Sequence, residues 1–332
     1  GTERISPEML NGYPPEYAIY TFDFNKILAC IGVITLHTAH YLPSYIFNYY
    51  SLLLSCAVPY FFMTSGYFLC TASNITLKKQ LHKILKLYLL GFILYGGFYI
   101  AKNGFDSITI SLKNLLLIIF WNSTPWNGTL WYIAAIISLL ILKIYILNKC
   151  SNKLTIRIGI ILILITSIFI LMDNFNIYNI SKYNFFIQGL PCFLWGQICM
   201  HNPHILMSKK YIYTFTITSI ILILLNISIS ALNINSQVYN TNFTSLIICT
   251  TIFMYSLKVN LKNNILIHIS KWGAMYTGYI YIFHMLFVSY THGICIKLGI
   301  ESLFLKSPTL FIFSFTVIFT ICIYPLLTKI KF

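Results

Sequence analysis

Apolar stretches of helical length recur along the whole chain, and they constrain its fold more than any other feature. A membrane-spanning helix needs roughly 20 mostly apolar residues. Only 9% of the 332 residues are charged, whereas a soluble domain carries about a quarter. The sequence therefore predicts an all-α polytopic membrane protein. The apolar segments cover residues 24–42, 50–72, 84–101, 107–121, 129–147, 156–172, 184–200, 211–232, 243–258, 273–296 and 308–328.

The segment 107–121 is the shortest, and its length suits a re-entrant or interfacial segment as well as a span. Basic residues gather in cytoplasmic loops, which decides between the two arrangements. If this segment does not cross and the N-terminus is cytoplasmic, most of the 22 lysines and arginines lie inside; if it crosses, most lie outside. We therefore expect about ten transmembrane helices, one short re-entrant or interfacial segment and both termini in the cytoplasm. A polar cytoplasmic tail, 1–20, would precede one membrane-embedded domain, 21–332.

The net charge of +15 would indicate nucleic-acid binding in a soluble protein, but here it fits basic cytoplasmic loops. The nine cysteines are scattered, with no CxxC pair and no Cys–His spacing typical of zinc. We expect the lipid bilayer as a partner, and neither nucleic acid nor a metal ion.

Histidines are the titratable residues expected at mid-membrane depth, where ionisable groups are costly and indicate function. Lys26 and His37 are eleven residues apart, about three helical turns and ~16 Å of rise, so they share one face. The lysine would lie at the cytoplasmic lip, His37 near mid-membrane, and His40 one turn further out. His284, in segment 273–296, is expected at the depth of His37. The alternative is that such histidines only hydrogen-bond between helices.

The second and third apolar segments add a small notch and a cationic pair. Ser65-Gly66 allows a helix or a ligand to approach closely, and plain helix packing explains it equally well. Lys83 and Lys86 are one turn apart at the predicted cytoplasmic end of the third helix. Such a pair can hold phosphate groups as point charges, although ordinary positive-inside anchoring is the simpler explanation.

Taken in order, these elements resemble the acyltransferase family 3 of integral membrane proteins. Two matches carry lysines where arginine is commoner in the family, which weakens bidentate phosphate binding. We expect the stand-alone O-acetyltransferase type, similar to the membrane half of vancomycin-resistance serine racemases. The matching motifs are Lys26 to His37, Pro59 to Tyr67, Lys83 to Tyr88, Leu130-Trp131-Tyr132 and Tyr281 to Met285.

The resemblance implies an acyltransferase that transfers groups other than aminoacyl groups. Such proteins usually move acetyl from cytoplasmic acetyl-CoA to a hydroxyl of an extracytoplasmic acceptor. The expected acceptor is a cell-surface polysaccharide or a lipid-linked glycan, and the expected location is the bacterial cytoplasmic (inner) membrane.

A mechanism follows from the expected depths. Three lysines would hold the phosphates of CoA, while the thioester reaches His37 past the notch. His37 would act as general base or as a transient acyl carrier, and desolvation at this depth favours its neutral form. His284 would orient His37 or polarise the thioester carbonyl, and Asp23 would hold Lys26. The assignments are catalytic His37, His284 and Asp23; donor-binding Lys26, Lys83, Lys86, Ser65 and Gly66; and substrate-binding His40, Trp131 and Tyr281.

The leading alternative is a transporter of a small polar solute such as an amino acid. It shares the spans and the mid-membrane polar residues, but the sequence lacks the inverted repeats and mid-span carboxylates that are frequent in transporters. A third possibility is a non-catalytic flippase or assembly factor for a surface polymer.

Overall fold

The computed structural model describes residues 16–105, 111–122, 128–177, 183–232 and 240–329, and these ranges contain helices and no strand. The helices in chain order are α2 (Glu16–His37), α3 (Ser44–Ser55), α4 (Ala57–Phe68), α5 (Asn74–Asn103), α6 (Leu112–Trp121), α7 (Trp131–Tyr145), α8 (Asn152–Asn174), α9 (Leu190–His201), α10 (Pro203–Met207), α11 (Lys209–Ala231), α12 (Asn242–Lys258), α13 (Asn264–Lys297), α14 (Glu301–Lys306) and α15 (Pro308–Lys329). Single 3₁₀ turns and one π-helix, η5 (Phe185–Gly189), connect some of them.

Eight helical stretches in the described residues are long and apolar enough to cross a membrane, which confirms an all-α polytopic membrane protein. Two further expected spans correspond to η5 with α9 and to α12, and α12 has 17 residues. The count of about ten therefore stays a prediction. Helix α6 has only ten residues, a length that agrees with a short re-entrant or interfacial segment.

Three boundaries differ from the sequence-based expectation. Helix α2 begins at Glu16, so the expected limit between tail and membrane domain at 20/21 lies inside a helix. The second expected span is divided at Cys56 into α3 and α4. Helix α2 ends at His37, and a separate 3₁₀ turn, Ala39–Tyr41, follows it.

Side-chain caps mark where several of these helices start. The Ser73 hydroxyl accepts from the backbone N–H of Thr76 (3.2 Å) at the start of α5. Thr241 and Thr244 form a reciprocal capping box at the start of α12. Such caps satisfy backbone N–H groups that have no partner within the helix, which matters in a bilayer, where no water replaces them.

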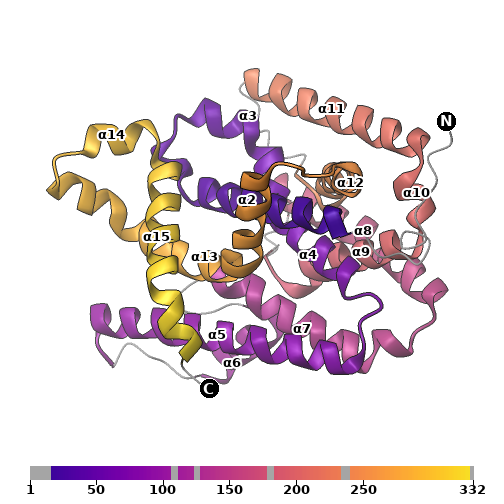
Figure 1. Ribbon diagram of the computed structural model, residues 1–332, viewed down its shortest axis with the longest axis horizontal. Coiled ribbons are helices and arrows are strands. Elements are labelled where there is room, and N and C mark those ends of the chain that lie inside the picture. The colour runs from indigo at the N-terminus through magenta and orange to yellow at the C-terminus, as the bar shows by residue number, and fades with distance from the viewer. Residues whose placement is uncertain (1–15, 106–110, 123–127, 178–182, 233–239, 330–332) are drawn as a thin grey trace.

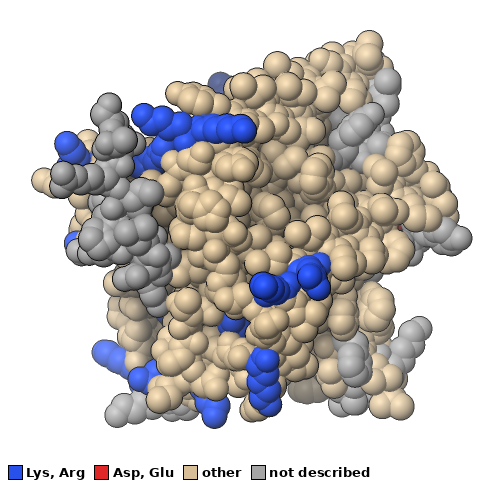
Figure 2. Space-filling model, turned by 90° about the vertical axis from the view of Figure 1, so that its right-hand side faces the viewer, with Lys and Arg blue, Asp and Glu red and all other residues tan. Residues whose placement is uncertain are grey.

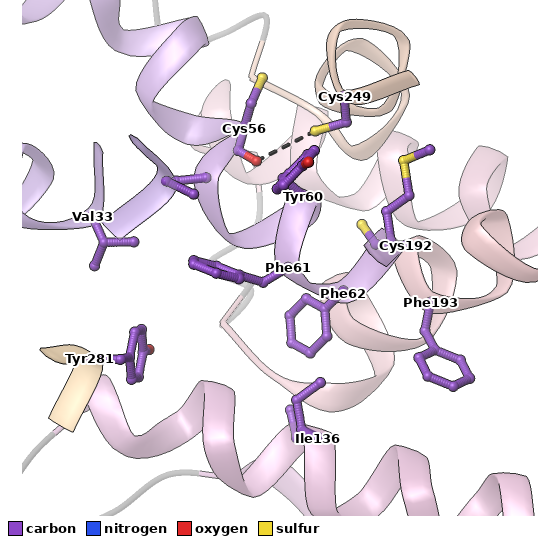
Figure 3. Packing of buried hydrophobic residues seen from close by; sticks show 14 of the residues in the cluster. Val33, Cys56, Tyr60, Phe61, Phe62, Ile136, Cys192, Phe193, Cys249 and Tyr281 are labelled. Carbon is purple, nitrogen blue, oxygen red and sulfur yellow. Dashed lines mark hydrogen bonds between the residues drawn. The ribbon is translucent and has the colours of Figure 1, made fainter. Parts of the chain in front are cut away.

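The centre of the molecule is formed by α4, α9 and α12, which are short and largely buried. Helices α4 and α9 touch through their backbones, because a Cβ atom at Gly66 would overlap the carbonyl oxygen of Phe193, and one at Gly196 would overlap that of Met63. Figure 3 shows buried side chains of these helices, with the Cys249 thiol on α12 donating to the carbonyl oxygen of Cys56 (3.4 Å).

The longer helices surround this centre. In Figure 1, α5 and α7 lie side by side along the lower edge and α11 runs along the upper edge. Helices α5, α11 and α15 expose many large apolar side chains, as expected of surfaces that face lipid. On the face drawn in Figure 2, Lys and Arg side chains lie in separate places across a largely uncharged surface.

Candidate active site

Helices α2 and α13 pack side by side in the same direction, and this packing sets the geometry of the site. About two turns into each helix, Gly273 leaves no room for a side chain, since a Cβ atom there would lie 2.7 Å from the carbonyl oxygen of Asp23. Further along, the Cys30 thiol donates to the carbonyl oxygen of Thr277 (3.9 Å). Seven residues later on each helix come His37 and His284, so both histidines lie about two turns beyond that contact.

The imidazole rings of His37 and His284 are neighbours, with centroids 5.4 Å apart and ring planes at 40°. His284 is 1% exposed, whereas His37 is only partly buried and lines a cavity. The structure thus brings together the two histidines that the sequence placed at one depth.

The hydrogen bonds of His284 define its tautomer. Its Nδ1 lies 2.6 Å from the carbonyl oxygen of Tyr281, and a carbonyl oxygen only accepts, so Nδ1 carries the proton. Nε2 is buried and has no hydrogen-bond partner among the described residues. Neutral His284 therefore presents a lone pair, and no second N–H group, next to His37.

One cavity, of about 340 Å³, is lined by Lys26 from α2, Ser65 from α4, and Lys83 and Lys86 from α5. We call it the lysine cavity. No acidic residue lines it within the described chain, so three cations face a small volume without a carboxylate in its wall. Outside this wall, Asp23 Oδ1 accepts from Lys26 Nζ at 2.7 Å. Lys26 also lies over the ring of Phe68 (5.9 Å), which adds a cation–π contact.

A second cavity, of about 690 Å³, is lined by His37 and Trp131. We call it the His37 cavity. In the described chain its wall contains no Lys, Arg, Asp or Glu. The remaining wall is made of apolar, aromatic, hydroxyl and amide side chains from α2, α3, η5 and α12, among others.

Tyr281 lines both cavities, and among the described residues it is the one that the two linings share. Its hydroxyl donates to the carbonyl oxygen of Thr129 (2.8 Å), and its ring lies 5.0 Å from that of Tyr132 and 5.5 Å from that of His284. Figure 3 shows Tyr281 on the side of the drawn residues where Val33 lies, away from Phe193. A fixed aromatic ring thus lies between the cationic volume and the histidine pair.

Two expected site residues lie elsewhere. Gly66 was expected beside the donor, but the backbone of α9 occupies the space next to it, so its role is to let two helices meet. His40 was expected on the helical face of His37; because α2 ends at His37, it lies instead in the following turn, exposed, with its ring 3.9 Å from that of Tyr41. It lines neither cavity.

Several wall residues were not singled out from the sequence. Thr64 lines the lysine cavity, and Gln188, Asn240 and Asn242 line the His37 cavity. A usable signal existed for Gln188, since it is an amide inside an apolar segment, and polar groups within spans indicate function. The asparagines lie at the start of a helix, where such residues usually act as caps.

The chain matches the model of the acyltransferase domain of acyltransferase family 3 over residues 19–327. An amino-acid racemase from Enterococcus faecalis is 31% identical over 157 residues, which are 45% of this chain and 20% of that protein. The match thus spans about a fifth of the racemase's length, and it agrees with the expected similarity to the membrane half of such racemases. No solved structure matches the chain significantly. Because the family match covers nearly the whole chain, from α2 to α15, this multi-pass membrane protein belongs to acyltransferase family 3.

Proposed function

We propose that this protein moves an acyl group, most simply acetyl, from cytoplasmic acyl-CoA to a hydroxyl of a cell-surface polysaccharide or lipid-linked glycan across the membrane. The observation that carries the proposal is the pair of cavities that meet at Tyr281, one lined by cations and one by His37. A donor that bears phosphates and an acceptor that bears hydroxyl groups need such different surroundings.

The lysine cavity supports binding of the donor. Lys26, Lys83 and Lys86 can each hold a phosphate oxygen as point charges, and charge-assisted hydrogen bonds of this kind are about twice as strong as neutral ones. Ser65 lines the same wall, so the pantetheine arm would run along α4 toward Tyr281. We assign this cavity to the cytoplasmic side, with both termini cytoplasmic, because that arrangement follows the positive-inside rule.

His37 is the proposed catalytic group. As the acceptor oxygen attacks the thioester carbonyl, its proton moves to a ring nitrogen of His37; as the C–S bond breaks, that proton passes to the CoA sulfur. The products are an O-acyl ester and CoA thiol. In the second form of the mechanism, a ring nitrogen of His37 attacks the thioester carbonyl and the CoA thiolate leaves; the acceptor oxygen then takes the acyl group from that nitrogen, and the acceptor proton passes to the thiolate.

His284 acts through His37 in this scheme. The lone pair on Nε2 suits acceptance of an N–H from His37, which leaves the other nitrogen of His37 basic. Polarising the thioester carbonyl would need an N–H donor, and the Nδ1 proton of His284 is already held by the backbone. We therefore favour a positioning role for His284 over the electrophilic role that the sequence also allowed.

The test is transfer of labelled acetyl from acetyl-CoA to surface glycan in membranes that contain the protein. His37→Ala should abolish transfer while the protein remains inserted and folded. His40→Ala is the matched control, because this neighbouring histidine lines neither cavity, and it should retain wild-type activity. Full activity of the His37→Ala protein would eliminate the scheme.

A transporter of a small polar solute remains the competing function, since two cavities that meet at one residue also suit alternating access. The curated relative named amino-acid racemase makes an amino acid the solute to test. Acetyl-CoA separates the two functions, because a ligand that binds the folded state raises the melting temperature. The enzyme requires this shift with acetyl-CoA, and the transporter requires it with the solute alone.

A further inference from the structure

Three amide side chains in the wall of the His37 cavity carry buried oxygen atoms without a hydrogen-bond partner among the described residues. They are Gln188 Oε1, Asn240 Oδ1 and Asn242 Oδ1. Gln188 comes from η5, whereas Asn240 and Asn242 lie at the start of α12. Leaving a buried acceptor unsatisfied costs about 1–3 kcal/mol, and such groups call for an explanation. Three in one wall mark a surface that a ligand rich in hydrogen-bond donors would stabilise.

The orientation of Asn242 is determined by its neighbours. Its Nδ2 donates to the Thr166 hydroxyl (2.8 Å) and to the carbonyl oxygen of Ile187. Because that carbonyl can only accept, the amide nitrogen must face it, and Oδ1 remains on the other side as an acceptor. Asn242 is 1% exposed, so its oxygen is held in place within the wall.

The charge of the same wall narrows the class of ligand. In the described chain no Lys or Arg lines this cavity to neutralise a carboxylate or a phosphate, and no Asp or Glu lines it to neutralise an ammonium group. Burying an unpaired charge is strongly unfavourable, whereas hydroxyl groups supply donors without charge. The rings of Trp131 and Tyr183, 5.8 Å apart, add aromatic faces that pack against the C–H groups of a sugar ring.

We propose that the His37 cavity binds an uncharged sugar ring of the acceptor, whose adjacent hydroxyls donate hydrogen bonds to Gln188, Asn240 and Asn242. A further hydroxyl of the same ring then lies at His37. This inference rests on the proposed function and specifies the acceptor as a neutral polyol.

The test measures binding without an acyl donor. Purified protein is titrated with methyl β-D-glucopyranoside, methyl N-acetyl-β-D-glucosaminide, methyl β-D-glucuronoside and L-serine, and tryptophan fluorescence is recorded because Trp131 lines the cavity. A neutral glycoside should change the fluorescence in a saturable way, and the glucuronoside and serine should not. No response to either neutral glycoside, or a response to serine or the glucuronoside alone, overturns the proposal.

Variants of Gln188 sharpen the test. Gln188→Met keeps the length of the side chain but removes its oxygen, and should raise the dissociation constant of the neutral glycoside about two- to tenfold. Gln188→Glu keeps an acceptor oxygen, because a buried carboxyl group without a cation stays protonated, and it should retain binding. Gln197→Met is the control, since Gln197 is a buried amide on α9 that lines neither cavity, and an equal loss in that variant would contradict a specific contact.

The outcomes also separate this inference from the proposed function. Glycoside binding that depends on Gln188, without acetyl transfer, would remove the acyltransferase assignment and keep the subsite. Acetyl transfer that is unaffected by Gln188→Met, with no glycoside response, would keep the enzyme and remove the subsite.

Discussion

The lysine cavity and the His37 cavity share Tyr281, yet their walls have opposite chemistry. Three ammonium groups line the first, while amides, hydroxyls and aromatic rings line the second, with no charged residue in its described wall. Helix α2 contributes to both, through Lys26 and then His37. The difference teaches that one helix can supply two chemically different cavity walls when its side chains change over about three turns.

Among these variants, loss of His284 should have the largest effect on acetyl transfer. The residue lies beside His37 but lines neither cavity, so its loss should change the rate and leave donor binding unchanged. We expect His284→Ala to lower kcat for acetyl transfer about 10²–10⁴-fold, with little change in KM for acetyl-CoA, measured with labelled donor. His292→Ala, on the same helix but paired with Glu301 (3.0 Å), is the control. A rise in donor KM with unchanged kcat would assign His284 to the lysine cavity instead.

Removal of the two lysines of α5 should weaken binding of the donor and leave binding of the acceptor unchanged. The Lys83→Ala/Lys86→Ala double variant is expected to raise KM for acetyl-CoA about tenfold or more, since hydrogen bonds to charged groups contribute about 1.5–3 kcal/mol, and the acceptor KM should stay unchanged. Salt should weaken donor binding in the wild type. Arginines at both positions should restore it, and Lys102→Ala, at the other end of α5, should have no effect. An equal rise in the KM values for acetyl-CoA and for the acceptor would contradict the assignment of these lysines to the donor alone.

A methyl group at Gly66 should disturb both cavities together. Helix α4 supplies Val58 to one wall and Ser65 to the other, and Gly66→Ala forces it away from α9. We expect a destabilisation of about 1–3 kcal/mol, seen as a lower melting temperature, with weaker binding of donor and acceptor. Gly97→Ala meets no atom within 4 Å and should be neutral or slightly stabilising. A wild-type melting temperature for Gly66→Ala would contradict the backbone contact.

The smallest effect is expected from the hydroxyl of Tyr281. Tyr281→Phe removes one hydrogen bond, to Thr129, of about 0.5–1.5 kcal/mol, and should lower acetyl transfer two- to tenfold. Its ring still separates the cavities, so release of CoA thiol without acceptor should remain low. Tyr281→Ala should raise that release by admitting water from the His37 cavity. Equal thiol release by the two variants would mean that Tyr281 is not the partition.

The sequence predicted those parts of the site that depend on regular helical rise. His37 and His284 lie side by side because α2 and α13 are continuous helices that pack together, and Lys83 and Lys86 of α5 line one cavity with Lys26. Short α6 was also foreseen from its length. Periodicity alone could not predict that Gly66 faces α9, because it assigns a residue to one face of its helix but does not show which helix packs there. The end of α2 before His40 and the amides of η5 and α12 depend on tertiary contacts between distant segments.

The missing side chain at Gly273 has a mechanical consequence for the histidine pair. It allows α13 to rest directly on the backbone of α2 at Asp23, ten or more residues before the rings of His37 and His284. Over that span of ~15 Å, a tilt of α13 by only ~4° about this point would move one ring by ~1 Å relative to the other. The absence of a side chain at Gly273 therefore controls the angle between α2 and α13, and through that angle the distance between the two imidazole rings.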